Sequence, residues 1–257
     1  MTASGRVIRP AGLAVPLVGC LPHGGLTYPG ELTSALAVAP EILWSDWLTT
    51  ELYEFLPELG ITTIATGFSR FVADVNRDPG GEQHGGFWTS VVAARMPNGR
   101  PIYYRPLTRG EISHRIRLAH EPFHLAVDQV VRDLLADFPR VILLDLHSFG
   151  AGLDGDVILG DRHGTTASPA TVGLVAGALE AAGLDVRRNQ RFTGGWTVRR
   201  FTRHDRVDAI QVELNQRRYL DLEQRRYPQA PPRGDFGGAQ RLLREALAGV
   251  AARAAAG

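Results

Sequence analysis

The chain has 257 residues, of which 44% are hydrophobic and 21% are charged, so it can bury the core of one α/β domain. Its 28 Lys and Arg residues against 27 Asp and Glu residues give a formal net charge of +1, which argues against nucleic acid or an anionic membrane as a partner and favours a small molecule. The single cysteine excludes an internal disulfide, and no apolar run approaches the roughly 20 residues of a membrane-spanning helix. Residues 1–10, which we expect to be flexible, show no signal-peptide pattern, so we predict a cytoplasmic protein.

The first predicted elements are a strand, a helix and a second strand. The apolar run at residues 13–19 leads into Pro22-His23-Gly24-Gly25, which is typical of a buried strand that enters a tight loop. Residues 45–59 carry Leu and Phe at helical spacing behind Ser45, a suitable N-cap, and predict a helix. Residues 61–66 predict the second strand.

The middle of the chain alternates between irregular and strongly helical sequence. Residues 69–106 are rich in Gly, Pro, Arg and Asn, which predicts a long functional loop region with a small hairpin at Pro97-Asn98-Gly99. Residues 108–138 then show helical periodicity, with an irregularity expected at Pro122.

The second half predicts further alternation around a central strand. Residues 141–146 form the most apolar stretch of the chain and predict a central parallel strand. The remaining elements are strands at 156–159, 186–189 and 209–214 and helices at 169–182 and from about 237. This order predicts an α/β fold over residues 1–257, a single three-layer domain with a mostly parallel or mixed sheet and helices on both faces.

Polar side chains stand at the ends of three predicted strands: His23, His147 and Glu213. Open α/β sheets bind ligands outside the carboxyl ends of their strands, so these side chains are expected to converge. An isolated loop histidine is more often structural, but the shared position after strands favours a site. Two imidazoles with a carboxylate are the usual ligands of a catalytic zinc ion, and another carboxylate is needed as general base. The cofactor predicted is Zn²⁺, with another divalent metal as the alternative.

A series of short motifs runs in order along residues 13–220. They are Pro22-His23-Gly24-Gly25, Asp46-Trp47, Ser69-Arg70-Phe71-Val72-Ala73-Asp74-Val75-Asn76-Arg77, Pro122-Phe123-His124, Asp145-Leu146-His147-Ser148, Gly160-Asp161-Arg162-His163-Gly164, Asn189, Gly194-Gly195 and Gln211-Val212-Glu213-Leu214-Asn215. In this order they resemble the N-formylglutamate amidohydrolase family. That family is similar to the zinc carboxypeptidases and implies their phosphorylase/hydrolase-like fold.

The resemblance implies a metal site built from His23, Asp46 and His147, with a fourth position left for water. The acid that zinc carboxypeptidases carry three residues after the first histidine is absent, because Leu26 stands there. Asp46 is therefore the preferred third ligand, and Glu31 is the alternative.

The same resemblance implies the residues that act on the substrate. Glu213 is predicted as the general base, and Arg77 as the group that stabilises the oxyanion or grips a substrate carboxylate. The sequence leaves the roles of Arg77, Arg70 and Asp74 interchangeable. The predicted substrate-binding residues are Arg70, Asn76, His124, Trp196, Arg199 and Arg200.

The predicted activity is hydrolysis of an N-formyl or N-acyl amino acid, or a related small amide that carries a carboxylate. A carboxypeptidase-like peptidase and a non-catalytic binding protein are the alternatives.

Two local patterns carry less weight. His120-Glu121-Pro122-Phe123-His124 matches a zincin motif, but Pro122 disfavours the uninterrupted helix which that motif needs. Cys20 precedes His23 on the strand and is expected to be a small buried hydrophobe.

Overall fold

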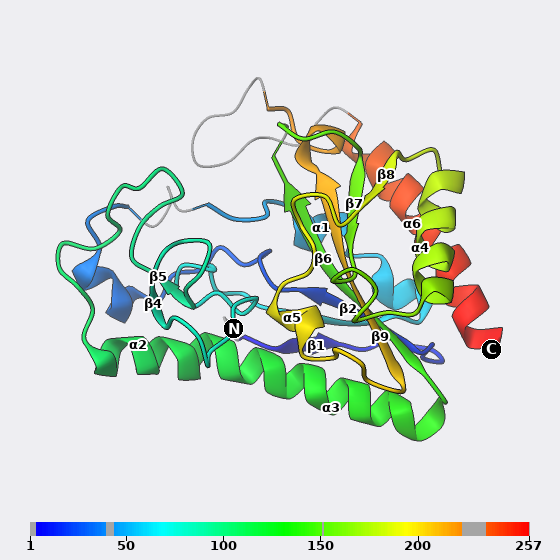
Figure 1. The fold of residues 1–257 in the computed structure, drawn as a ribbon, viewed down its shortest axis with the longest axis horizontal. Helices are drawn as coiled ribbons and strands as arrows, with labels where there is room; N and C mark the ends of the chain where they lie inside the picture. The colour runs from blue at the N-terminus through cyan, green and yellow to red at the C-terminus, as the bar shows by residue number, and fades with distance from the viewer. Residues whose placement is uncertain (1–3, 40–43, 151, 223–234, 257) are drawn as a thin grey trace.

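The computed structural model describes residues 4–39, 44–150, 152–222 and 235–256. Within them, a seven-stranded sheet with the order β1-β3-β2-β6-β9-β7-β8 passes through the centre of the molecule (Figure 1). Its strands are β1 (Arg6–Ile8), β2 (Leu17–Leu21), β3 (Thr62–Ala65), β6 (Val141–Phe149), β7 (Val157–Gly160), β8 (Val186–Arg188) and β9 (Val207–Asn215). Two pairings, β1 with β3 and β7 with β9, are antiparallel, and the others are parallel, so the sheet is mixed.

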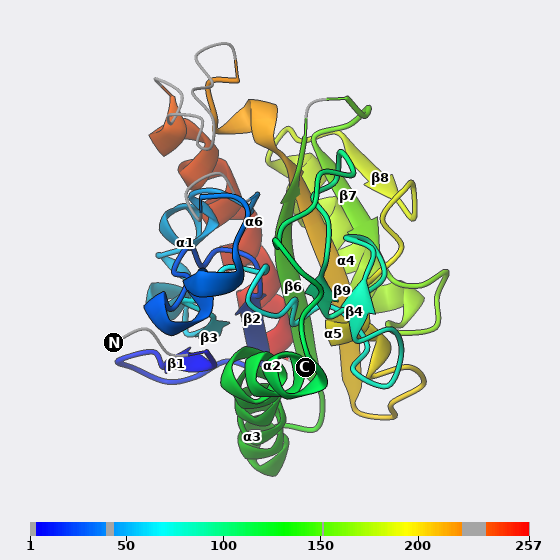
Figure 2. The same ribbon diagram turned by 90° about the vertical axis from the view of Figure 1, so that its left-hand side faces the viewer.

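Helices cover both faces of this sheet (Figures 1 and 2). The helices are α1 (Thr49–Leu52), α2 (Arg109–Arg115), α3 (Glu121–Asp137), α4 (Pro169–Ala181), α5 (Trp196–Arg199) and α6 (Phe236–Ala256). Alternate residues of β6 face opposite layers: Leu144 packs in the cluster that includes α4 and α6, and Leu143 packs in the cluster that includes α3. The predicted three-layer α/β fold is therefore confirmed. No helix in the described ranges is both long and apolar enough to cross a membrane.

The central strands β6 and β9 are longer than their apolar cores predicted. Every residue of both strands is buried, and the pairing runs from Val141 opposite Val207 to Phe149 opposite Asn215. His147, which was expected after its strand, therefore lies inside β6, and the register places it opposite Glu213 of β9. Their proximity follows from the pairing of the strands.

Two predicted segments differ from the structure. Residues 1–10 were expected to be flexible, but Arg6–Ile8 forms the edge strand β1, while residues 1–3 lie outside the described part. The helix expected at 45–59 is wrong: only Thr49–Leu52 is α-helical, and a 3₁₀ turn follows at Leu56–Leu59. Leu48 has a φ of 58°, in the left-handed region that interrupts a helix.

The helical segment predicted at 108–138 is present and has an irregularity where Pro122 predicted one. A capping box of Thr108 and Glu111 starts α2, and a π-helical turn at Ile116–His120 separates α2 from α3. Pro122 occupies the first turn of α3, where a missing N–H costs little. The helical path through His120 is thus continuous, although the sequence had disfavoured an uninterrupted helix there.

The segment from 69 to 106 is a packed loop region. It contains the small parallel pair β4 (His84–Gly85) and β5 (Val92–Ala93), and an Arg95–Pro101 bridge closes the predicted hairpin. Its apolar side chains pack in one cluster with apolar residues of the 32–38 segment and of the helical segment that begins at α2. This packing fixes the backbone of the loops that line the site described next.

Candidate functional site

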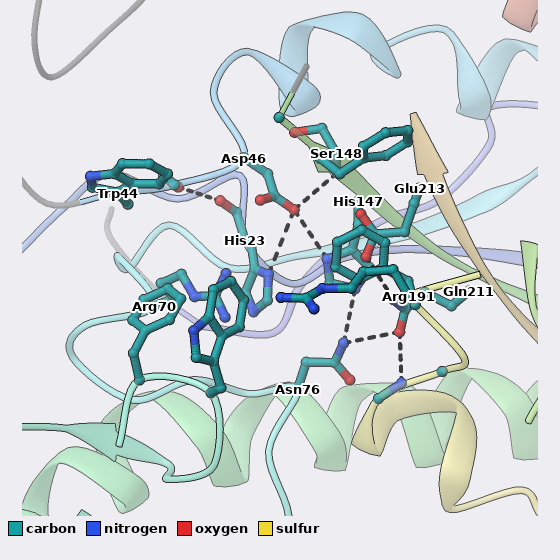
Figure 3. Close-up of a pocket in the computed structure, with 18 of the residues that line it drawn as sticks. His23, Trp44, Asp46, Arg70, Asn76, His147, Ser148, Arg191, Gln211 and Glu213 are labelled. Carbon is teal, nitrogen blue, oxygen red and sulfur yellow. Dashed lines mark hydrogen bonds and ion pairs between the residues drawn. The ribbon is translucent and has the colours of Figure 1, made fainter. Parts of the chain in front are cut away.

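Three buried side chains converge at the carboxyl-terminal edge of the central strands (Figure 3). They are His23 after β2, Asp46 before α1 and His147 near the end of β6, and their potential ligand atoms lie within 4.8 Å of one another. Asp46 Oδ2 is 3.0 Å from His147 Nδ1 and 3.6 Å from His23 Nδ1. Glu31, the alternative ligand, is exposed and belongs to a 3₁₀ helix at Gly30–Ala35.

The outer nitrogen of each histidine points to a second carboxylate. His23 Nε2 is 2.7 Å from Asp74 Oδ1, and His147 Nε2 is 3.0 Å from Asp145 Oδ2. Such carboxylates fix the orientation of an imidazole whose other nitrogen binds a metal. Two imidazole nitrogens and one carboxylate oxygen remain, which is a donor set that suits a divalent ion such as zinc.

Asp46 is held as a carboxylate. Burial alone would raise its pKa, but the hydrogen bond with His147 and the close contact with His23 lower the pKa far below its ordinary value. The backbone N–H of Ser148 also donates to Asp46 Oδ2 at 3.2 Å. A buried, ionised carboxylate beside two imidazoles can serve as a metal ligand.

Glu213 lies in the same pocket from the neighbouring strand β9. Burial raises the pKa of Glu213 to about 7, while the nearby His147 lowers it and the negative charge of Asp46 raises it. Gln211 Nε2 donates to Glu213 Oε1 at 2.7 Å and orients the carboxyl group. A carboxyl group that gains and loses a proton near neutral pH suits acid–base chemistry.

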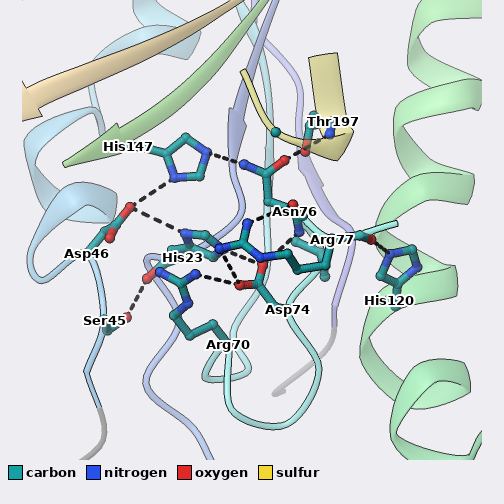
Figure 4. Close-up of polar contacts among 12 residues, drawn as sticks. His23, Ser45, Asp46, Arg70, Asp74, Asn76, Arg77, His120, His147 and Thr197 are labelled. Atoms are coloured by element: carbon teal, nitrogen blue, oxygen red, sulfur yellow. Dashed lines mark hydrogen bonds and ion pairs between the residues drawn. The ribbon is translucent and has the colours of Figure 1, made fainter. Parts of the chain in front are cut away.

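Asp74 connects His23 to the arginines of the neighbouring loop (Figure 4). Arg70 NH2 lies 2.5 Å and Arg77 NH2 3.8 Å from Asp74 Oδ2, while Asp74 Oδ1 faces His23. Burial raises the pKa of Asp74, but the charges of Arg70, His23 and Arg77 lower it well below its ordinary value. The Asn76 N–H also donates to Asp74 Oδ1 at 2.9 Å.

His124, a predicted substrate-binding residue, and its neighbour His120 hold the backbone of this loop. His120 Nε2 is 2.9 Å from the Arg77 carbonyl oxygen, and His124 Nε2 is 2.7 Å from the Val75 carbonyl oxygen. The two histidines lie on one side of the α3 start, with ring centroids 4.5 Å apart. Both histidines contact loop carbonyl oxygens and lie outside the pocket lining, so the zincin-like motif positions the loop and does not provide ligands of this cluster.

Asn76 ties the loop to the rest of the site. Its Nδ2 lies 3.0 Å from His147 Nε2, and its Oδ1 accepts a hydrogen bond from Thr197 N in α5 at 2.9 Å. Gly195 lies so close that a Cβ there would come within 2.4 Å of the Asn76 amide. The Gly194-Gly195 motif therefore leaves room for Asn76.

A pocket of about 360 Å³ opens above these groups. Of the residues predicted from the sequence, it is lined by His23, Asp46, Arg70, Asn76, Arg77, His147 and Glu213. It is also lined by Gln211 from the last sequence motif and by residues that the sequence did not mark as part of a site: Trp44, Phe87, Trp88, Phe149, Arg191 and Phe192. These lie mostly in loops, where no periodicity marks them.

Four predicted substrate-binding residues lie outside this lining. His124 and Arg200 contact each other at 2.7 Å, and Arg200 pairs with Asp128 at 2.6 Å. Arg199 is half exposed beside Asp78, and its guanidinium stacks over the Trp196 ring. The structure therefore assigns these side chains to packing and surface ion pairs.

Cys20 is fully buried in β2, as expected, and burial raises the pKa of its thiol.

A mixed α/β sheet with a buried His-Asp-His cluster and a buried glutamate at its carboxyl edge is typical of hydrolases that use a metal ion. The chain belongs to the N-formylglutamate amidohydrolase family, whose model matches residues 15–220. The resemblance found in the sequence motifs is thereby confirmed.

Several relatives of this chain are known. It is 30% identical over 221 residues to an N-formylglutamate deformylase from Pseudomonas aeruginosa, covering 80% of this chain and 83% of the relative. It is 29% identical to an N-formylglutamate deformylase from Pseudomonas putida, covering 80% and 82%. A crystal structure of an N-formylglutamate amidohydrolase from Ralstonia eutropha JMP134 superposes with a TM-score of 0.81 at 30% identity, covering 96% of each chain.

Proposed function

We propose that the protein is a metal-dependent deformylase that cleaves the amide bond of an N-formyl amino acid, with N-formylglutamate as the first substrate to test. The observation that carries the proposal is the convergence of His23, Asp46 and His147 beside the buried carboxyl group of Glu213. The names of the Pseudomonas relatives point to the same substrate. The small volume of the pocket favours an amino-acid derivative over a peptide.

The residues His23, Asp46 and His147 would hold the metal, as argued above from their donor atoms. When bound, a divalent ion polarises a carbonyl group and lowers the pKa of a coordinated water. Asp74 and Asp145 keep the two imidazoles turned toward it.

Glu213 moves the proton. Its carboxylate takes a proton from the attacking water as the new bond to the formyl carbon forms. It then gives that proton to the amide nitrogen as the C–N bond breaks, so that a free amine and formic acid leave, and the acid ionises to formate in water. A pKa of about 7 matches both halves of this task, because the group can accept and donate at neutral pH.

Arg77 and Arg70 supply positive charge next to the cluster. Their side chains are only 17% and 10% exposed, and Asp74 holds both. Such fixed donors stabilise the oxygen that becomes negative in the transition state, or they bind the substrate carboxylate next to the amide. Asn76 contributes an amide group on the same wall.

The first test concerns the metal. We expect about one divalent ion per chain after dialysis of the purified protein against zinc, measured by elemental analysis. The double variant His23→Ala, His147→Ala removes two of three ligands and should hold less than a tenth of that amount. His84→Ala, a histidine bound to the Val92 carbonyl outside the pocket lining, is the matched control and should keep its metal. Full metal content in the double variant would refute the site.

The second test is a screen of N-formyl, N-acetyl and N-carbamoyl amino acids with the metal-loaded protein. Hydrolysis of the formyl compounds, measured as released formate and amine, supports the proposal. A protein that holds metal and hydrolyses none of them would instead be a binding protein.

A further inference from the structure

Of the arginines that the structure describes, Arg70, Arg77 and Arg191 line the pocket, and their ion-pair contacts differ. Arg70 and Arg77 share the single carboxylate of Asp74, at 2.5 and 3.8 Å. For Arg191, by contrast, no acidic side chain in the described part of the chain lies within ion-pair distance. The pocket therefore has cationic side chains at two places: the Arg70 and Arg77 pair that contacts Asp74, and Arg191.

The loop that carries Arg191 is held in a fixed and unusual backbone conformation. Asn189 and Arg191 have φ values of 52° and 59°, in the left-handed region of backbone conformation that residues other than glycine rarely adopt. The Asn189 side chain donates to Asp161 Oδ1 at 2.6 Å, and the Arg162 N–H donates to the Thr193 carbonyl oxygen at 2.7 Å. The chain is thus anchored both before and after Arg191.

Arg191 and the other two arginines lie at different depths. Arg70 and Arg77 are nearly buried beside the metal cluster, whereas Arg191 is exposed. Its side chain extends into the pocket (Figure 3). Phe149 and Phe192, whose ring centroids are 5.8 Å apart, line the same wall. This wall offers apolar surface to a short carbon chain and a cation to the group at its end.

We propose that Arg191 selects substrates with an acidic side chain by binding the side-chain carboxylate. This inference rests on the proposed function. In an N-formyl amino acid only one carbon separates the α-carboxylate from the amide nitrogen. The α-carboxylate must therefore stay near the His23-Asp46-His147 cluster, where Arg70 and Arg77 can bind it. A carboxylate at the end of the side chain reaches farther out, toward Arg191, which forms no ion pair with any acidic residue that the structure describes. The Arg70 and Arg77 pair and the separate Arg191 then match the two carboxylates of a dicarboxylic substrate.

The test compares kcat/KM for N-formyl-L-glutamate, its side-chain amide N-formyl-L-glutamine and its α-amide N-formyl-L-isoglutamine. The wild-type protein should prefer the glutamate to the glutamine compound by about 10- to 100-fold, as charged hydrogen bonds allow. Arg191→Ala should lose most of that preference and keep the preference for a free α-carboxylate. Arg191→Lys should keep part of it, because the charge remains while the planar fork is lost. Retention of the full preference in Arg191→Ala would overturn the proposal.

A control and a second measurement make the result independent of turnover. Arg199→Ala removes an exposed arginine outside the pocket lining and should leave both preferences unchanged. Calorimetry should show that wild-type protein binds L-glutamate more tightly than L-glutamine and that Arg191→Ala does not discriminate. This outcome supports the role of Arg191 even if no N-formyl compound is hydrolysed, in which case only the proposed reaction fails. Equal binding of L-glutamate and L-glutamine by the wild-type protein would overturn the proposed role of Arg191.

Discussion

Glu213→Gln should reduce the turnover of N-formyl amino acids by about 100-fold or more while the protein still binds its metal. Glutamine has the shape of glutamate but cannot accept a proton from water or return one to the leaving amine. KM should change much less than kcat, because the proposed metal ligands and the pocket arginines Arg70, Arg77 and Arg191 are unchanged. The measurement is steady-state kinetics together with metal content. Near-normal turnover would show that a residue other than Glu213 is the general base.

The stability of the same variant separates lost chemistry from lost folding. The folded-state pKa of Glu213 is raised from 4.5 to about 7, so burial favours the protonated form. In the metal-free wild-type protein this raised pKa costs stability as the pH rises through that range, by about 3 kcal/mol above pH 7. Glu213→Gln should therefore unfold at a higher temperature than wild type at pH 8 and at a similar temperature at pH 5. Glu58→Gln, which changes a surface glutamate paired with Arg244, is the control and should show no such difference.

The sequence predicted the parts of the site that depend on the sheet. Apolar runs mark β6 and β9, and the carboxyl ends of parallel strands lie at one edge, so His147 and Glu213 had to be near each other. The family resemblance, and not the strand pattern, predicts Asp46 as a ligand, because the contacts of Asp46 depend on the backbone that enters α1. There Leu48 adopts a left-handed conformation, and no helical periodicity can reveal such a change.

The arginines show the opposite case. Sequence position alone cannot separate Arg199 and Arg200, which pair with Asp78 and Asp128, from an arginine that faces the pocket. Arg191 is directed into the pocket by a loop whose shape depends on contacts with Asp161 and Arg162, distant in sequence. Those contacts explain why the Gly160-Asp161-Arg162-His163-Gly164 motif belongs to the site although it is not in the pocket lining.

Asp74→Ala should both weaken metal binding and destabilise the fold. The substitution leaves the Arg70 and Arg77 guanidinium groups, which are nearly buried, without their shared carboxylate. Removing one member of a buried charge group costs on the order of 3–5 kcal/mol of unfolding free energy. His23 Nε2 would also lose its carboxylate, which typically lowers metal affinity by about 10- to 100-fold. Urea unfolding of the metal-free protein and a chelator competition titration measure the two effects.

The pH dependence and two matched variants make this prediction specific. Arg70, His23 and Arg77 outweigh the effect of burial and keep the folded-state pKa of Asp74 below its ordinary value. Its contribution to stability is therefore present at neutral pH and lost as the pH falls below the ordinary carboxyl range of about 4. The difference in unfolding free energy between wild type and Asp74→Ala should therefore become smaller in acid.

Asp133→Ala, which breaks the exposed pair with Arg9, should cost less than about 1 kcal/mol and leave metal binding intact. Asp74→Asn keeps an oxygen for the Asn76 N–H but removes the charge, so it should lose most of the stability that Asp74→Ala loses. A fully stable Asp74→Asn would show that shape, and not charge, holds the arginines in place.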